Sequence, residues 1–115
     1  MSKLGLAIAI AAEAFKDKVD KGGQPYILHC LRVMNAVNGN DEVKSAAVLH
    51  DIIEDADYTY YSLKNLGFND KTCLLVMILT KNRELPYLDY IKNIAEFPAA
   101  KEIKLADLED NMDMR

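Results

Sequence analysis

The sequence predicts an all-α protein, a compact bundle of about six or seven short helices. Apolar residues recur at helical spacing along most of the chain, and no segment alternates between apolar and polar residues over a useful length. The helix-breaking residues are few, five Gly and three Pro in 115 residues, and they fall between the helical segments. Half of the residues are hydrophobic, which is enough for the core of a single domain, residues 1–115.

The positions of Gly, Pro and capping residues predict where each helix begins. The first three helices are expected over about Lys3 to Val19, Ile27 to Val37 and Asp41 to Glu54, and four shorter ones near Thr59, Asn69, Pro86 and Pro98. Asp41, Thr59 and Asn69 can act as N-caps, because their side-chain oxygens accept hydrogen bonds from free backbone N–H groups. Pro86 and Pro98 suit a first helical turn.

Apolar positions predict which face of each helix is buried. The helix that begins at Asp41 is apolar around most of its circumference, so it should lie at the centre of the domain. In the helix capped by Asn69, the residues expected to face inward are Cys73, Leu74, Met77 and Ile78.

Composition and local pattern disfavour several classes of protein. Lys3 and the apolar run Leu4–Ala12 also fit a short signal peptide, but the helical pattern continues unbroken to Phe15, which favours a helix. No stretch approaches the length needed to span a membrane. Cys30 and Cys73 are too few for a disulfide framework, so we expect reduced, partly buried thiols and a cytoplasmic protein. The net charge of −4 disfavours nucleic-acid binding, so an anionic substrate would need a local basic cluster or a metal.

The two histidines, His29 and His50, both fall in helices that otherwise look buried. Asp51 follows His50, and Glu54 and Asp55 come four positions after this pair, so the sequence places an imidazole and three carboxylates on one helical face. Buried ionisable groups are costly unless they are paired or bind a metal, so this density of acids favours a cation site. Taken alone, the His50-Asp51 pair could equally be a dipeptide on a helix surface.

The final segment, IKLADLEDNMD, carries two stripes at helical spacing. Leu105, Leu108 and Met112 form the apolar stripe, and the second stripe is polar, with Lys104, Asp107 and Asn111. Periodicity alone favours a polar stripe that faces water.

Four blocks of the sequence occur in the order found in the hydrolase domain of the RelA/SpoT family. They are DKGGQPYILHCLRV, AAVLHDIIEDADYT, LTKNRELPYLDYI and IKLADLEDNMD, and with their spacers they cover nearly the whole chain. The chain therefore resembles this HD-superfamily domain, and the resemblance implies an HD-type fold and a metal-dependent phosphohydrolase.

The resemblance also implies a role for particular residues. The metal ligands would be His29, His50, Asp51 and Asp107, and the metal would be manganese. Glu54 and Asp55 would orient or activate the attacking water, Lys21 would lie near the nucleotide, and Asn111 would contact its nucleoside part.

Each of these roles has a plainer alternative. His29 could be a hydrogen-bonded core histidine, Glu54 and Asp55 could end a helix on its solvated side, and Lys21 could be solvated. Tyr87 and Tyr90 could line the pocket, although core packing is the favoured interpretation.

The chain departs from the family pattern at several positions. Phe15 stands where many relatives have His, Asp20 where they often have Arg, and Leu108 and Asp110 where they have Arg and His. The loss of positive charge affects the expected recognition of guanine and pyrophosphate more than that of the metal. The family domain usually continues beyond the position of Asn111, so a shortened version of it is a further alternative.

The expected reaction is removal of the 3′-pyrophosphate of guanosine tetra- or pentaphosphate. The alternatives are an HD-type nucleotidase acting on another nucleotide and a non-catalytic nucleotide-binding module. The expected partner is a nucleotide, and the sequence leaves the oligomeric state open.

Overall fold

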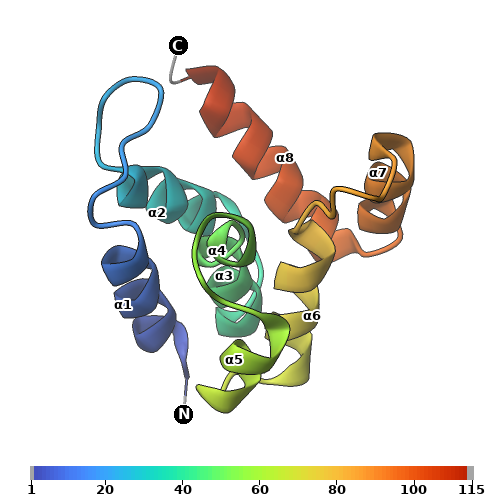
Figure 1. Ribbon diagram of the computed structural model, residues 1–115, viewed down its shortest axis with the longest axis horizontal. Coiled ribbons are helices and arrows are strands. Elements are labelled where there is room, and N and C mark those ends of the chain that lie inside the picture. Colours follow the sequence, from blue (N-terminus) through green and yellow to red (C-terminus); the bar gives the residue numbers. More distant parts are fainter. Residues whose placement is uncertain (1, 114–115) are drawn as a thin grey trace.

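The computed structural model describes residues 2–113, and Figure 1 shows them as eight helices with their connections. The helices are α1 (Leu4–Ala14), α2 (Tyr26–Ala36), α3 (Asp41–Val48), α4 (Ile52–Asp55), α5 (Tyr60–Asn65), α6 (Asp70–Leu79), α7 (Tyr87–Ala95) and α8 (Pro98–Asp113). No β-strand occurs among these residues, and the isolated bridge between Val19 and Pro25 closes the loop before α2. The all-α prediction is therefore confirmed.

Helix α3 lies at the centre of the molecule. It packs against α1, α2 and α6, and Figure 1 shows it enclosed by these neighbours. Its second half is fully buried from Ala46 through Val48, and Leu49 and Ile52 beyond it are also 0% exposed. This confirms the central position that its apolar circumference predicted.

The expected helix from Asp41 to Glu54 is interrupted, which the sequence did not indicate. Helix α3 ends at Val48 and α4 begins at Ile52. In the bend between them, the N–H of His50 donates to Ala47 O at 3.3 Å, and the N–H of Ile52 donates to Leu49 O at 2.9 Å. These three-residue spacings tighten the chain and satisfy carbonyls at the end of α3. No Gly or Pro marks the break, so the prediction of one continuous helix was wrong.

The caps of the later helices agree with the sequence, but that of α3 does not. Asn69 accepts from the N–H of Thr72 at 3.0 Å, and Thr59 forms a capping box with Ser62. At α3 the cap is Asn40, whose side chain accepts from the N–H of Val43 at 3.1 Å. Asp41, the predicted cap, is instead the first helical residue, where its charge still favours the helix dipole.

Two helices bury a face that differs from the expected one. In α6, Cys73 is buried and Ile78 packs against the core as expected, but Leu74 and Met77 are 38% and 46% exposed. In α8 the apolar stripe faces outward, and its exposed fractions are 50% for Leu105, 42% for Leu108 and 61% for Met112. The buried residues of α8 are Ala100, Ile103, Ala106 and Asp107. The polar stripe of α8 therefore lies against the molecule, and the prediction that it faces water was wrong.

Two further expectations concern the first helix and the thiols. Helix α1 ends at Ala14, well before Val19, and a loop leads from there to α2. Cys30 and Cys73 are both free and buried, as expected. Among the described residues, no helix is long and apolar enough to cross a membrane.

Candidate metal centre

His29 is positioned by α2, where it is 0% exposed. Its two ring nitrogens both reach carboxylates of α8. Nε2 lies 2.9 Å from Oδ1 of Asp107, and Nδ1 lies 2.6 Å from Oδ2 of Asp110. A buried histidine with a carboxylate on each side has the surroundings of a metal ligand as well as those of a paired core residue.

His50 lies in the bend between α3 and α4 and is 4% exposed. Its Nδ1 is 2.6 Å from the carbonyl oxygen of Ala47, which can only accept, so Nδ1 carries the proton. Its Nε2 lies 3.0 Å from Oδ1 of Asp107 and 3.1 Å from Oδ2 of Asp51. The bend therefore turns this imidazole toward both carboxylates.

The ligand atoms of His29, His50, Asp51 and Asp107 all lie within 4.8 Å of one another. They come from α2, from the bend before α4 and from α8, so the fold brings together residues that are far apart in the sequence. Two imidazoles and two carboxylates form a donor set that suits a divalent transition metal. The cluster is thus compatible with a divalent metal.

The imidazoles and carboxylates of the cluster shift one another's pKa values. Burial alone would lower the pKa of His50, but hydrogen bonds to Asp107 and Asp51 outweigh it and raise the pKa to about 10. Burial would raise the pKa of Asp107, but hydrogen bonds from His29 and His50 hold it far below its usual range. Asp107 is therefore ionised, which is the form that binds a metal.

Glu54 and Asp55 lie in α4, which begins directly after Asp51, and both are exposed. Burial, and then the charges of Asp51 and Asp55, raise the pKa of Glu54. Asp55 accepts an ion-pair hydrogen bond from Nζ of Lys18 at 2.8 Å. These two acids thus stand in different surroundings, although they are adjacent in the sequence.

Asn111 and Lys21, the predicted substrate contacts, have different positions. Asn111 lies one turn after Asp107 on α8 and donates to its Oδ1 at 3.3 Å, so it borders the cluster. Lys21 is exposed in the loop before α2, and the described residues give it no hydrogen bond or ion pair. The structure brings Asn111 to the cluster but shows no such contact for Lys21.

Two residues that contact the cluster, Tyr26 and Lys104, were given no role in the site from the sequence. The hydroxyl of Tyr26 donates to Oδ2 of Asp51. Burial, and then the charge of Asp51, raise the pKa of Tyr26 far above its usual range, so the phenol stays protonated as a donor. Nζ of Lys104 lies 3.4 Å from Oδ2 of Asp107. The position of Tyr26, one helical turn before His29, was the signal in the sequence that could have indicated its place near the cluster.

The tyrosines of α7 separate into a core residue and a surface residue. Tyr90 is 4% exposed, and its hydroxyl donates to Leu79 O at 2.6 Å, so core packing is confirmed for it. Tyr87 is 58% exposed, so the same interpretation was wrong for Tyr87.

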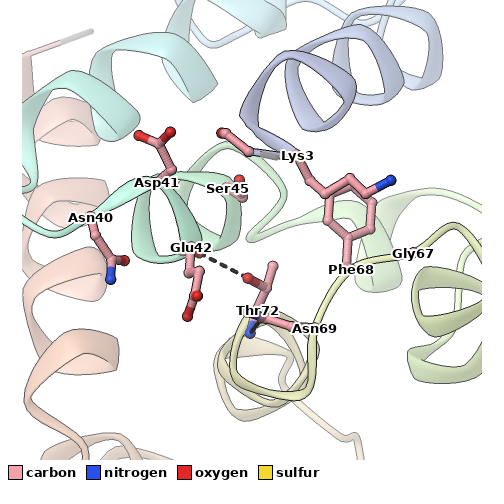
Figure 2. A pocket seen from close by; sticks show the side chains of 10 residues that line it. Lys3, Asn40, Asp41, Glu42, Ser45, Gly67, Phe68, Asn69 and Thr72 are labelled. Carbon is pink, nitrogen blue, oxygen red and sulfur yellow. Dashed lines mark hydrogen bonds between the residues drawn. The ribbon is translucent and has the colours of Figure 1, made fainter.

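A cavity of about 560 Å³ lies elsewhere, between the N-terminal ends of α3 and α6 (Figure 2). Its charged lining residues are Lys3, Asp41 and Glu42. Helix N-termini attract anions, but the lining of this cavity has two carboxylates and one ammonium group, which disfavours phosphate. None of the predicted site residues lines this cavity, so the chemistry is concentrated at the histidine cluster.

The structure is a bundle of short helices in which two His and two Asp side chains meet, with the His50-Asp51 pair in a bend. This is the architecture of an HD-type hydrolase domain. Comparisons with known proteins give the particular relationship. A solved structure of a metazoan SpoT orthologue that hydrolyses ppGpp matches with a TM-score of 0.83 and 29% identity, covering 98% of this chain and 70% of that one. No family model matches the sequence.

The curated relatives agree with the structural match. A guanosine-3′,5′-bis(diphosphate) 3′-pyrophosphohydrolase of Aquifex aeolicus is 34% identical over 92% of this chain and 17% of its own length. The pyrophosphohydrolase MESH1 of Drosophila melanogaster is 34% identical over 76% of this chain and 54% of its own length. In sequence and fold this chain thus resembles HD-superfamily hydrolases of the RelA/SpoT type, and it spans about half the length of the MESH1 relatives.

Proposed function

We propose that this chain is a metal-dependent phosphohydrolase that removes the 3′-pyrophosphate of guanosine tetra- or pentaphosphate. The observation that carries the proposal is the convergence of His29, His50, Asp51 and Asp107, all within 4.8 Å, in a chain whose relatives are named for this reaction. These four residues would hold the metal, which we propose to be Mn²⁺. Four protein ligands would leave coordination positions on the metal for water and substrate, as a catalytic site requires.

A bound divalent metal would supply a more acidic water and a polarised phosphoryl oxygen. The side chains around it would complete the chemistry. Glu54 has a raised pKa next to the cluster, which suits a carboxylate oxygen that accepts the proton of the attacking water. Asp55 is held by Lys18, so it would orient that water through a fixed oxygen. Asn111 would contact the nucleoside, and Lys21 would meet the phosphates from its exposed position on the loop before α2.

A second candidate is hydrolysis of a nucleotide with fewer phosphates. Arg32 is paired with Asp110 at 2.7 Å, and Lys18 with Asp55 at 2.8 Å, so the basic side chains near the cluster are already neutralised. A hollow of about 370 Å³ beside them is lined by three carboxylates and a single guanidinium, from Asp20, Asp110, Asp113 and Arg32. Such a lining favours a substrate with less negative charge than an alarmone carries.

The two candidates are separated by a substrate panel. The purified protein is incubated with Mn²⁺ and either ppGpp, GDP, GTP or nucleoside monophosphates, and the products are resolved by ion-exchange chromatography. We expect ppGpp to give GDP and pyrophosphate. Release of phosphate from a monophosphate, with ppGpp left intact, would replace the alarmone by the second candidate.

The metal requirement is tested by His50→Ala and Asp51→Asn. Each removes a proposed ligand, so we expect loss of both bound Mn²⁺, by elemental analysis, and turnover. Asp89→Asn is the control, because Asp89 is an exposed acid on α7 and takes no part in the cluster. Turnover that persists in metal-stripped protein would contradict the proposal.

Two free, buried cysteines agree with a cytoplasmic location, which we include in the proposal.

A further inference from the structure

We propose that Asp110 is a positioning residue for His29, fixing the tautomer and orientation that turn the ring's Nε2 toward the metal site. The inference rests on the proposed role of His29 as a ligand. It concerns a residue outside the four proposed ligands, one that would act on the metal through His29.

The first support for this inference is the geometry at the two sides of the ring. Nδ1 of His29 lies 2.6 Å from Oδ2 of Asp110, whereas Nε2 lies 2.9 Å from Oδ1 of Asp107. Both carboxylates can only accept, so each side of the ring favours a proton while no metal is bound. A metal bound in the cluster would replace the proton on Nε2, and the remaining proton of the neutral ring would stay on Nδ1, where Asp110 accepts it. Carboxylates that accept from the second nitrogen of a ligating histidine fix the ring in this way at metal sites generally.

The second support is that Asp110 is itself held in place. Its other oxygen, Oδ1, accepts from Nε of Arg32 at 2.7 Å, so each carboxylate oxygen has a separate partner. Arg32 also lies 3.8 Å from Asp20, whose Oδ1 accepts from the N–H of Gly22 at 2.8 Å and of Gln24 at 3.0 Å. The carboxylate that faces His29 is therefore anchored through Arg32 to the loop that precedes α2.

The third support is the comparison with His50, the other imidazole of the cluster. Nδ1 of His50 donates to the carbonyl of Ala47 at 2.6 Å, one turn earlier in its own segment. The backbone bend thus supplies the acceptor for His50. His29 lies inside the uninterrupted helix α2 and takes its acceptor from α8 instead. Both rings present Nε2 to Asp107, but in His29 this depends on a side chain that can be replaced.

The experiment compares Asp110→Ala and Asp110→Asn with Glu109→Gln. Glu109 is the exposed neighbour on α8, so its substitution removes the same charge without touching His29. The dissociation constant for Zn²⁺ is measured by competition with a chelating dye. We expect Asp110→Ala to weaken Zn²⁺ binding by about 10- to 100-fold and Glu109→Gln to leave it unchanged. Asp110→Asn should fall between them, because its amide oxygen can still accept from Nδ1.

A spectroscopic readout separates positioning from simple bridging of α2 to α8. The chain has two histidines, so long-range ¹H–¹⁵N spectra of the Zn²⁺-loaded protein contain two rings, assigned with a His29→Ala sample. We expect both rings to carry the proton on Nδ1 in the unaltered protein. In Asp110→Asn the nitrogen shifts of His29 should move, while those of His50 should stay in place.

The outcomes distinguish this inference from the proposed function. If the unaltered protein binds neither Zn²⁺ nor Mn²⁺, the metal site itself is wrong, and the role of Asp110 falls with it. If the unaltered protein binds metal, and both Asp110 variants keep the same affinity and the same His29 shifts, Asp110 is not a positioning residue, although the metal site stands. A variant that loses thermal stability without any change in these shifts also contradicts positioning.

Discussion

One carboxylate oxygen, Oδ1 of Asp107, lies within 3.0 Å of Nε2 of both histidines and receives a third contact from Asn111 at 3.3 Å. Asp51 adds a second carboxylate, and Tyr26 donates to it. Each ring nitrogen and each carboxylate of the cluster therefore has a named partner, and among the described residues no buried side-chain N or O atom lacks one. At the residue scale, the side chains of the cluster therefore fix one another through hydrogen bonds and ion pairs.

The hydrogen bond from Tyr26 to Asp51 gives a prediction at this scale. Tyr26→Phe removes the hydroxyl that orients the carboxylate of Asp51 but keeps the aromatic ring. This ring packs edge-on against Phe15, with the two ring centroids 5.1 Å apart. We expect Mn²⁺ affinity to fall by about tenfold while thermal stability changes little. Isothermal titration calorimetry with Mn²⁺ measures the first quantity. Tyr61→Phe, at an exposed tyrosine of α5, is the control, and equal affinities for all three proteins would contradict the prediction.

Two acidic residues that depart from the family pattern, Asp20 and Asp110, have structural contacts that the net charge did not indicate. Asp20 and Asp110 were expected to weaken phosphate recognition. In the structure both lie near Arg32, at 3.8 Å and 2.7 Å, and Asp20 also accepts two backbone N–H groups of its own loop. Their charges are partly neutralised by these contacts, so they act first as structural partners.

At the scale of single elements, α8 decides the geometry of the site. Its sequence has apolar and polar stripes, and the buried face includes Asp107 together with Ile103 and Ala106. Helix α8 packs along α2, which carries His29, and against α6 and α7. The apolar residues of its outer face remain exposed, so the stripe that looked like the core is on the surface.

This orientation of α8 gives a prediction from two apolar residues of the same helix. Ile103 is 0% exposed and Leu105 is 50% exposed. Ile103→Ala should lower the free energy of unfolding by about 2–5 kcal/mol, because it leaves a cavity in the core. Leu105→Ala should change it by less than about 0.5 kcal/mol, as at other surface positions. Urea denaturation measures both, and the reverse order would show that α8 is rotated from its position here.

At the scale of the whole molecule, the cluster joins three parts of the chain. His29 comes from α2, the His50-Asp51 pair from the bend after α3, and Asp107 from α8. A metal bound by all four would link elements that otherwise meet through the core. Binding to the folded chain alone shifts the folding equilibrium toward the native state.

Removal of the metal should therefore lower the melting temperature. At a free metal concentration of about 100 times the dissociation constant, the stabilisation is about 2.7 kcal/mol. Differential scanning calorimetry of the Mn²⁺-loaded protein, before and after a chelator is added, measures the shift, and His50→Ala should show none. An equal response of this variant to Mn²⁺ would place the metal outside the cluster.

Sequence periodicity was a reliable guide to the existence of helices but not to how each one is rotated or interrupted. Thr59 and Asn69 cap their helices as predicted, because capping depends on neighbouring backbone groups. Leu74, Met77 and the stripe beginning at Leu105 were assigned to the wrong face, because their burial depends on neighbours distant in sequence. The structure brings together the four residues that the resemblance named, His29, His50, Asp51 and Asp107. The contact of Asp110 with His29 had no marker in the sequence, and that of Tyr26 had only its position one turn before His29.

The sequence by itself determined the all-α class, the central position of the third helix and the residue types of a candidate metal site, since local backbone preferences and the chemistry of His and Asp are carried by the residues themselves. Only the tertiary structure decided that the polar stripe of α8 faces inward, that a bend turns His50 toward Asp107, and that Asp110 meets His29. These features depend on which surfaces of different helices pack together, and that choice is made by the free energy of the whole core.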